Sequence, residues 1–159
     1  MSIAGTQDAA GTPPEIDWAG LRRAALAAAR RAYAPYSGYA VGCAALVDDG
    51  RVISGCNVEN ASYGVTLCAE CVLVGQLHLG GGSAGPEAAA REAGGAGSGP
   101  PRLVAFDCVN GAGETITPCG RCRQLLREAA APGMRLNTPA GLRTIEEMLP
   151  ESFGPANLA

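Results

Sequence analysis

Two short cysteine clusters hold the residues of this sequence whose types and spacing suit a chemical reaction. Cys68 begins a Cys-Ala-Glu triplet that ends at Glu70, and Cys119 and Cys122 lie three residues apart much later in the chain. Zinc held by three thiolates keeps its fourth position for water, and a neighbouring carboxylate can move protons to and from that water. The sequence therefore predicts one zinc ion per chain, bound by Cys68, Cys119 and Cys122, with Glu70 as the catalytic residue of a hydrolytic reaction.

Both clusters are predicted to lie at the starts of helices. A spacing of three residues places Cys119 and Cys122 on one face of a helix, and Cys68 opens another. The partial positive charge at a helix N-terminus lowers the pKa of a thiol and supports thiolates. Three thiolates leave the zinc site with a net negative charge, which Arg121 or Arg123 could offset.

A fourth cysteine leaves an alternative open. Cys71 makes the first cluster a Cys-x-x-Cys pair, which could join the second pair in a closed structural site of four thiolates. The pairs of zinc ribbons are usually about 15–20 residues apart, and the two clusters here are much farther apart. A closed site also has no use for Glu70. Redox chemistry at a Cys-x-x-Cys pair gives no reason for two copies.

Composition narrows the class of protein. The 159 residues suit one domain, and a hydrophobic fraction of 47% is enough for a core. A net charge of −3 argues against nucleic-acid binding, and no run approaches the roughly 18 apolar residues of a membrane helix. The first residues do not resemble a signal peptide, and seven cysteines in such a chain indicate reduced thiols and a cytoplasmic location. All twelve basic residues are arginines and His78 is the single histidine, so proton transfer must depend largely on carboxylates.

Hydrophobic patterns predict the elements that position the two clusters. A helix capped by Asp17 ends before Pro35, and a hairpin turn at Asp48-Asp49-Gly50 joins two strands. The remaining elements follow in order: strands at 39–47 and 51–57, a helix at about 68–79, a strand at 103–109, a helix at 119–130, a short strand at 134–137, an optional strand at 142–143, and a last helix opened by a capping box at 144–147. Alternating helices and strands indicate an α/β sandwich.

The chain is predicted to form one domain with two irregular segments. Residues 1–14 lack periodicity and suggest a disordered N-terminal tail, and residues 15–159 form the domain. Within it, residues 80–101 are dominated by Gly, Ala and Ser, which indicates a flexible surface insertion.

The other cysteines and several acidic residues have ordinary interpretations. Cys43, Cys56 and Cys108 fall in predicted strands, where a cysteine is most often a small buried hydrophobe. His78 lies at a predicted helix end, where a solvated role is expected. Turn or surface positions are expected for three carboxylates: Asp48, Asp49 and Asp107.

Four motifs in order resemble the small homotetrameric cytidine deaminases. They are Tyr36-Ser37-Gly38-Tyr39-Ala40-Val41-Gly42, Asn57-Val58-Glu59-Asn60-Ala61-Ser62-Tyr63-Gly64, Cys68-Ala69-Glu70, and Pro118-Cys119-Gly120-Arg121-Cys122-Arg123-Gln124. The terminal Leu149-Pro150-Glu151-Ser152-Phe153-Gly154 is also similar to that family's last segment, and the resemblance spans residues 17–158 apart from the insertion. It implies a three-layer α/β/α sandwich with a mixed five-stranded sheet.

The resemblance also implies roles for individual residues. Cys68, Cys119 and Cys122 match the zinc ligands, and Glu70 matches the proton shuttle. Asn57 and Glu59 match the pair that holds the ribose 3′-hydroxyl, with Val58 between them in the substrate-binding segment. Tyr39 stands where the family usually has a phenylalanine that packs on the pyrimidine ring. Three more residues would complete a pocket shared between subunits: Ala61, Tyr63 and Phe153. Many members have arginine where this chain has Cys71.

The implied function is zinc-dependent hydrolytic deamination of cytidine and 2′-deoxycytidine to uridine and 2′-deoxyuridine, with release of ammonia, in pyrimidine salvage. Glu70 would carry a proton from the attacking water to ring N3. The expected partner is a small nucleoside, with no nucleic acid or membrane, and the expected assembly is a homotetramer. Two alternatives stay open: a deaminase of another aminopyrimidine nucleoside such as blasticidin S, and a non-enzymatic module with a closed four-cysteine zinc site.

Overall fold

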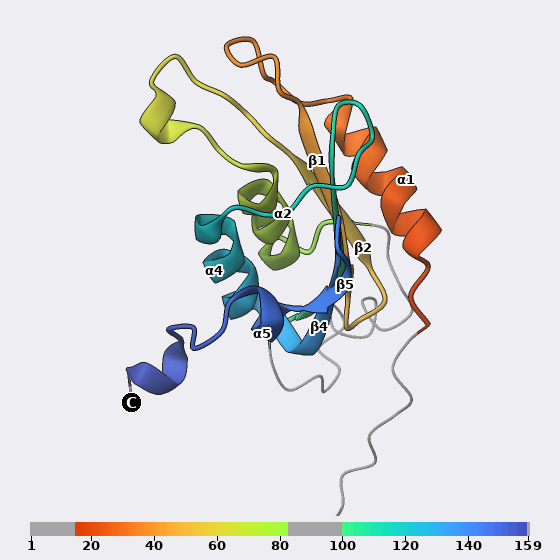
Figure 1. Ribbon diagram of the computed structural model, residues 1–159, viewed down its shortest axis with the longest axis vertical. Helices are drawn as coiled ribbons and strands as arrows, with labels where there is room; N and C mark the ends of the chain where they lie inside the picture. The colour runs from red at the N-terminus through yellow and green to blue at the C-terminus, as the bar shows by residue number, and fades with distance from the viewer. Residues whose placement is uncertain (1–14, 83–99, 159) are drawn as a thin grey trace, which may run out of the picture.

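The structure, a computed structural model, describes residues 15–82 and 100–158 (Figure 1). The predicted tail at 1–14 and most of the predicted insertion at 80–101 lie outside the described residues. Within the part that is described, each helix is too short or too polar to span a bilayer.

A five-stranded mixed sheet forms the middle layer, with the strand order β2-β1-β3-β4-β5. Its strands are β1 (Val41–Val47), β2 (Val52–Cys56), β3 (Leu103–Asn110), β4 (Ala130–Thr138) and β5 (Gly141–Thr144). β3 and β4 pair in parallel, and every other pair of neighbouring strands is antiparallel. The turn predicted at Asp48-Asp49-Gly50 joins β1 and β2 in a hairpin.

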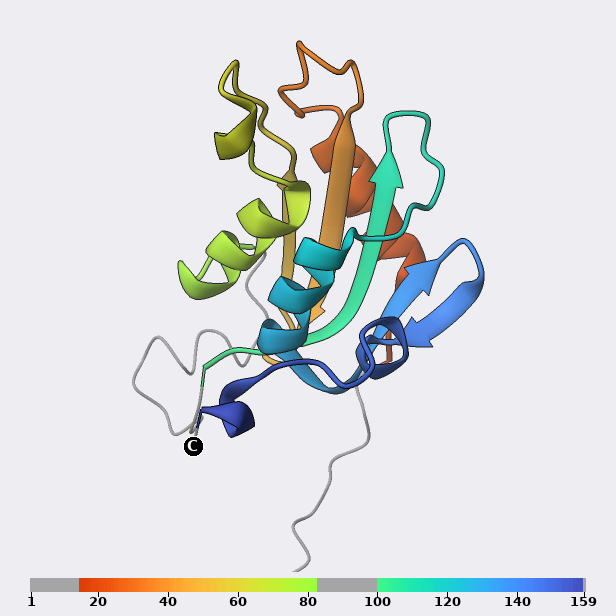
Figure 2. The same ribbon diagram turned by 60° about the vertical axis from the view of Figure 1, so that its left-hand side comes forward.

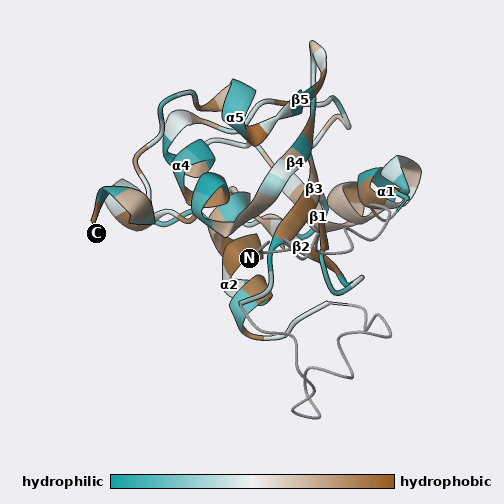
Figure 3. Cartoon of the chain, turned by 90° about the horizontal axis from the view of Figure 1, so that it is seen from below, coloured by the Kyte–Doolittle hydropathy of each residue, from teal (hydrophilic) through white to brown (hydrophobic). Residues whose placement is uncertain are grey.

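Helices cover both faces of the sheet (Figure 2). One face carries α1 (Trp18–Ala29), and the other carries α2 (Ala69–His78), α4 (Gly120–Ala129) and α5 (Ile145–Met148). Short 3-10 helices lie at Tyr63–Val65 and Pro155–Asn157. Viewed from below, hydrophobic strands lie between the helices of the two faces (Figure 3). A separate hydrophobic core fills each side of the sheet. The predicted three-layer sandwich with a mixed five-stranded sheet is confirmed.

Helix α1 is shorter at its C-terminus than the sequence suggests. The Asp17 carboxylate accepts a hydrogen bond of 2.8 Å from the Gly20 N–H, as the predicted cap requires. The helix ends at Ala29, not just before Pro35. The chain then leaves the helix because Tyr33 pairs with the segment after β2. Its N–H donates to the Asn57 carbonyl at 3.0 Å, and its carbonyl accepts from the Glu59 N–H at 2.8 Å.

Two glycines let helices from opposite layers approach the sheet closely. A Cβ at Gly42 of β1 would lie 2.2 Å from the Ala25 carbonyl of α1, and one at Gly55 of β2 would lie 2.3 Å from the Ala69 carbonyl of α2. Any larger residue would push these helices away. The Gly55 contact matters for function because Ala69 lies between Cys68 and Glu70, so it sets the position of the first cluster.

Strand β4 is longer than the predicted segment 134–137. It begins at Ala130, directly after α4, and its pairing with β3 shifts register between Leu103 and Ala105. Pro132 and Gly133 lie in the shifted part. Because Pro and Gly are uncommon inside regular strands, this bulged start has no strand pattern in the sequence.

The prediction that Asp107 is a turn or surface residue is wrong. Its side chain is fully buried in β3, and its Oδ2 accepts from Nε of Arg22 in α1 at 2.7 Å. Cys43 and Cys108 are buried as expected and pair across β1 and β3, whereas Cys56 is only half-buried. His78 ends α2 and is exposed. The predicted capping box of Thr144 and Glu147 is present at the start of α5.

Candidate metal centre and substrate pocket

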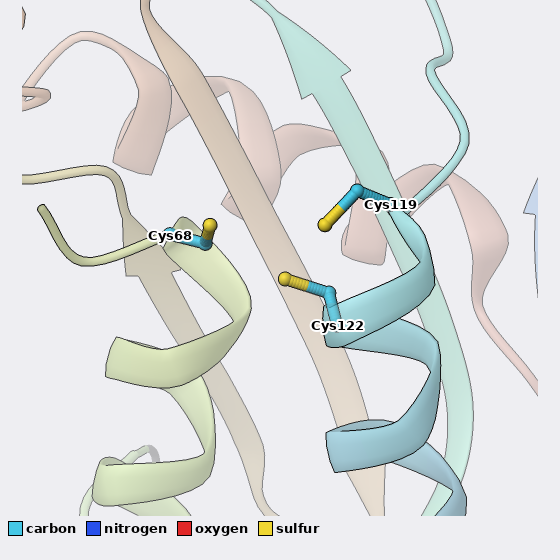
Figure 4. A group of neighbouring side chains, drawn as sticks. All are labelled: Cys68, Cys119 and Cys122. Carbon is cyan, nitrogen blue, oxygen red and sulfur yellow. The ribbon is translucent and has the colours of Figure 1, made fainter. Parts of the chain in front are cut away.

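The N-termini of α2 and α4 bring three cysteines together. Cys68 caps α2, Cys119 caps α4, and Cys122 lies in the first turn of α4. Their sulfur atoms point toward one another, and all lie within 4.8 Å of each other (Figure 4). Among the described residues, these three cysteines form the group whose ligand atoms lie close enough together to hold a metal ion.

The three sulfurs fit a zinc ion. A tetrahedral site with Zn–S bonds of about 2.3 Å separates its sulfurs by about 3.8 Å, within the spread seen here. Thiolate sulfur is also a donor that zinc prefers. Both helices direct their N-terminal partial positive charge toward the cluster, which favours thiolates.

Arg123 fixes the approach of the chain to Cys119. Its Nε donates to the Pro118 carbonyl at 2.8 Å, and its Nη1 donates to the Met148 carbonyl of α5 at 3.3 Å. The guanidinium thereby ties the residue before the metal-ligating cysteine to the neighbouring helix. Its planar fork suits such double contacts better than a lysine would.

Burial raises the pKa of two of the clustered cysteines, Cys68 and Cys122. It is the main cause that raises the pKa of the Cys122 thiol, and the nearby Glu70 carboxylate adds to the rise by its charge and by a hydrogen bond. Burial also raises the pKa of Cys68. Zinc binds thiolates and not thiols, so loading the site must release protons, and metal affinity weakens as the pH falls.

Glu70 lies in the first turn of α2 with 5% of its surface exposed. A buried carboxylate needs hydrogen-bonding partners or a nearby cation. The Cys122 side chain is one such partner, which places the carboxylate beside the sulfur cluster.

Cys71 is outside the three-sulfur group. It is half-buried, one helical turn after Cys68, and its sulfur accepts a hydrogen bond from Nη2 of Arg121 at 3.5 Å. This geometry disfavours the closed site of four thiolates. It also brings Arg121, and not Arg123, beside Cys71.

A small pocket opens over the cysteines, and we call it the cysteine pocket. Its volume is about 220 Å³, and it is lined by Val41, Asn57, Thr66, Leu67, Cys68, Ala69, Glu70, Ile116, Thr117, Cys119 and Cys122. Most of the wall is apolar, and its polar side chains include Asn57, Glu70 and two threonines. Such a site can exclude bulk water while it presents a few reactive groups.

Asn57 connects the cysteine pocket to the segment before β1. Its side chain is buried, with Oδ1 accepting from the Val41 N–H at 2.8 Å and Nδ2 donating to the Tyr39 carbonyl at 2.9 Å. A carboxamide has two N–H donors and two lone pairs. These two bonds therefore leave one donor and one lone pair for another group.

A second hollow, the Glu59 pocket, adjoins the first. It measures about 400 Å³ and is lined by Tyr36, Ser37, Glu59, Tyr63 and Thr66. Thr66 lines both pockets, which makes them neighbours. The Ser37 hydroxyl is the main cause that lowers the pKa of Glu59, and backbone N–H groups of Tyr36 and Ser37 add to the effect. Glu59 is therefore anionic at neutral pH.

The sequence profile of the cytidine and deoxycytidylate deaminase zinc-binding region matches residues 19–136. The chain belongs to this family. A cytidine deaminase from Mycobacterium tuberculosis is 48% identical over 141 residues, which cover 89% of this chain and 92% of that protein. Another from Halalkalibacterium halodurans is 33% identical, covering 84% of this chain and 91% of that protein. The crystal structure of cytidine deaminase from Mycobacterium tuberculosis aligns with a TM-score of 0.73 at 47% identity, covering 88% of this chain and 99% of that one.

Membership of the deaminase family confirms several predictions made from the motifs. The family, the α/β fold and the zinc-binding character agree with the sequence interpretation, and the chain is an enzyme of a zinc-dependent deaminase family. The cluster of three cysteines supplies donors suited to that ion.

Four of the residues predicted to bind the deaminase substrate line neither pocket of the single chain: Tyr39, Val58, Ala61 and Phe153. Tyr39 is 50% exposed and Phe153 is 59% exposed. The Phe153 carbonyl accepts from Nε2 of Gln124 at 3.0 Å, so the C-terminal segment lies along α4. Tyr63 lines the Glu59 pocket, yet 76% of its surface is exposed.

Two threonines in the wall of the cysteine pocket were missed from the sequence. Thr66 and Thr117 each lie two residues before a cysteine that caps a helix. The Thr66 hydroxyl also accepts from the Asn60 N–H at 3.2 Å, which closes the loop between the pockets. The equal spacing before both cysteines is the signal that could have identified them.

Proposed function

We propose that this protein catalyses the zinc-dependent hydrolytic deamination of cytidine and 2′-deoxycytidine. The observation that supports this most strongly is the meeting of three cysteine sulfurs and one buried carboxylate in a single small pocket. Relatives named cytidine deaminase align with nearly the whole described chain and with its fold. Both lines of support agree on a zinc-dependent deaminase.

Zinc bound by Cys68, Cys119 and Cys122 would supply a Lewis acid that lowers the pKa of water at its open position. Glu70 takes the proton from the attacking water and delivers it to ring N3. It then takes the proton of the hydroxyl group added at C4 and passes it to the leaving amine, so the C4 carbonyl forms as ammonia departs. Its buried position suits this role, because few water molecules compete for the proton.

The two adjoining pockets suit the two halves of a nucleoside. The cysteine pocket receives the pyrimidine, whose faces pack against apolar wall residues such as Val41 and Ile116. The Glu59 pocket receives the sugar, whose 3′-hydroxyl donates to the Glu59 carboxylate. Asn57 can donate to the oxygen of the same hydroxyl through its remaining N–H. A carboxylate here repels a 5′-phosphate, so nucleosides are preferred over nucleotides.

We also propose that Val58, Tyr39, Ala61, Tyr63 and Phe153 act in substrate binding through a homotetramer in which neighbouring subunits share walls. The exposure of Tyr39, Val58, Tyr63 and Phe153 in the single chain supports this, because exposed large apolar side chains often mark a surface that a partner covers. None of the seven cysteines forms a disulfide, which supports a cytoplasmic location, and the role proposed there is pyrimidine salvage.

The experiment that tests the function follows the loss of ultraviolet absorbance as cytidine becomes uridine. Protein carrying one zinc per chain should convert cytidine, a chelator should abolish the reaction, and added zinc should restore it. Blasticidin S run in parallel tests the alternative substrate. Zinc-loaded protein that leaves cytidine unchanged would contradict the proposal, and zinc that resists chelation without any activity would favour a closed structural site.

A further inference from the structure

Ser37 connects two residues that we assign to the substrate. Its hydroxyl donates to Oε1 of Glu59 and accepts a hydrogen bond of 2.9 Å from the Tyr39 N–H. The other carboxylate oxygen, Oε2, accepts from the N–H groups of Tyr36 and Ser37 at 2.9 and 3.2 Å. Both oxygens of Glu59 are therefore held by the turn that contains Ser37.

The backbone of this turn makes the arrangement possible. Gly38 has a φ of +67°, in the left-handed region that favours glycine. Its N–H donates to the Ala34 carbonyl at 3.0 Å, which closes the turn. The reversal at Gly38 brings the Tyr39 N–H back to the Ser37 hydroxyl, so one side chain satisfies a backbone donor and orients a carboxylate.

The bonds continue from Ser37 to the cysteine pocket. Tyr39 uses its N–H for the Ser37 hydroxyl and its carbonyl for Nδ2 of Asn57. Asn57 lines the cysteine pocket, while Ser37 and Glu59 line the adjoining one. An unbroken path of hydrogen bonds thus joins the carboxylate proposed to bind the sugar to the wall around the base.

We propose that Ser37 is a positioning residue, whose hydroxyl aims the Glu59 carboxylate at the 3′-hydroxyl of the nucleoside and fixes it relative to the base. The inference rests on the proposed function, because it acts through Glu59 and a sugar hydroxyl. Ser37 itself need not touch the substrate. A carboxylate has about four acceptor positions, so the three donors from the turn leave room for one more from the sugar.

The local environment favours this role over a purely structural one. Ser37 is exposed and lies in a surface turn, outside both hydrophobic cores. The hydrogen bond from its hydroxyl also lowers the pKa of Glu59, which keeps the carboxylate an acceptor. Removing the hydroxyl should therefore loosen one carboxylate and leave the fold intact.

The test compares Ser37→Ala with wild type on cytidine and on 3′-deoxycytidine, which lacks only the hydroxyl that Glu59 is proposed to bind. Values of kcat/KM come from first-order decay at high enzyme concentration, so slow turnover is still measured. Each protein is checked for zinc content and Tm. Ser54→Ala is the matched control, because Ser54 is an exposed serine on the edge strand β2.

With cytidine, Ser37→Ala should lower kcat/KM about tenfold, as expected when a charged acceptor loses a hydrogen bond. With 3′-deoxycytidine, the change should stay within about twofold, because there is no sugar hydroxyl to misalign. Ser37→Thr keeps the hydroxyl and should restore most of the cytidine value. Ser54→Ala should leave kcat/KM unchanged for both substrates. If the alanine variant does not fold, Ser37→Cys keeps the volume with a weaker donor and should show the same selective loss.

The outcomes separate the two hypotheses. Wild type that leaves cytidine unchanged would overturn the proposed function, and this inference with it. Wild type that deaminates cytidine, with Ser37→Ala slowing both substrates by the same factor, would overturn only the positioning role. Failure of Ser37→Thr to recover activity, with a folded and zinc-loaded protein, would count against it too.

Discussion

At the scale of residues, the site depends on which of several similar side chains the fold buries. Glu70 is 5% exposed beside the sulfur cluster, whereas Glu128 of α4 is exposed to solvent. Cys68 and Cys71 lie three residues apart on α2, yet only Cys68 joins the group that could hold a metal. Residue type alone would treat the members of each pair alike.

Replacing Glu70 by glutamine should remove the proton carrier and keep the shape of the side chain. We expect kcat for cytidine to fall by about 10²- to 10⁴-fold, the usual contribution of general acid–base catalysis. Metal analysis should still find one zinc per chain, because the three sulfurs are untouched. Glu128→Gln is the matched control. A Glu70→Gln enzyme with near wild-type kcat would remove Glu70 from this role.

Replacing Cys71 by alanine should leave the metal in place. Its sulfur contacts Arg121 and is outside the metal-ligating group, so zinc content should stay near one per chain. Cys68→Ala is the comparison, and it should lose most of its zinc. Metal analysis after dialysis against a weak chelator measures both. A Cys71→Ala protein that loses zinc as readily as Cys68→Ala would restore the closed four-cysteine site.

At the scale of elements, a polar network across the far face of the sheet braces the loop that leads to Cys119. Arg22 of α1 binds both oxygens of Asp107, at 2.7 and 3.2 Å, and its Nη1 donates to the Gly113 carbonyl at 3.2 Å. It also donates to the Thr115 hydroxyl. One side chain thus joins α1, β3 and the segment from Gly113 to the pocket wall at Ile116.

Two adjacent arginines of α1 offer a test of this network. Arg22→Ala leaves the fully buried Asp107 without its cation and should lower the free energy of unfolding by about 3 kcal/mol or more. Arg23→Ala breaks an exposed contact of 3.5 Å with Asp17 and should cost about 0.5 kcal/mol or less. Urea unfolding measures both. Equal losses of unfolding free energy would show that the Arg22–Asp107 pair stabilises the fold no more than the exposed Arg23–Asp17 contact does.

At the scale of the whole molecule, several large aromatic side chains are exposed in the single chain. Tyr36, Tyr63 and Phe153 are each about half exposed or more, and the tyrosines flank the Glu59 pocket. The rings of Tyr36 and Tyr63 meet edge to face, with their centroids 6.2 Å apart. An apolar rim of this kind fits a surface that a second subunit covers.

Subunit mixing tests whether neighbours share the pocket. Glu70→Gln and Phe153→Ala proteins should each be weak, because one lacks the proton carrier and the other lacks a wall. If Phe153 serves a neighbour's pocket, randomly mixed oligomers should recover about one quarter of wild-type activity. Light scattering should show four chains per particle. Mixtures no more active than the average of the two variants would contradict a shared pocket.

Local signals correctly predicted that cysteines stand at two helix starts, and they predicted several helix caps, because each of these features depends on a few neighbouring residues. Cys119 and Cys122 are one helical turn apart whatever the rest of the chain does, and Asp17 and Thr144 cap their helices through backbone N–H groups three residues away. The start of β4 was missed because Pro132 and Gly133 disrupt its strand pattern. Asp107 was missed because its partner, Arg22, is 85 residues away.

The sequence itself therefore determined the types of metal-ligating residue, the helix starts and the family motifs. These depend on interactions within one helical turn or one hairpin. Only the tertiary structure decided that Cys71 contacts Arg121 instead of joining the sulfur cluster, that Asp107 is buried, and that Thr66 separates two adjoining pockets. Each of these outcomes depends on how α1, α2 and α4 pack on the sheet. That packing brings together residues far apart in the chain, where no local spacing constrains them.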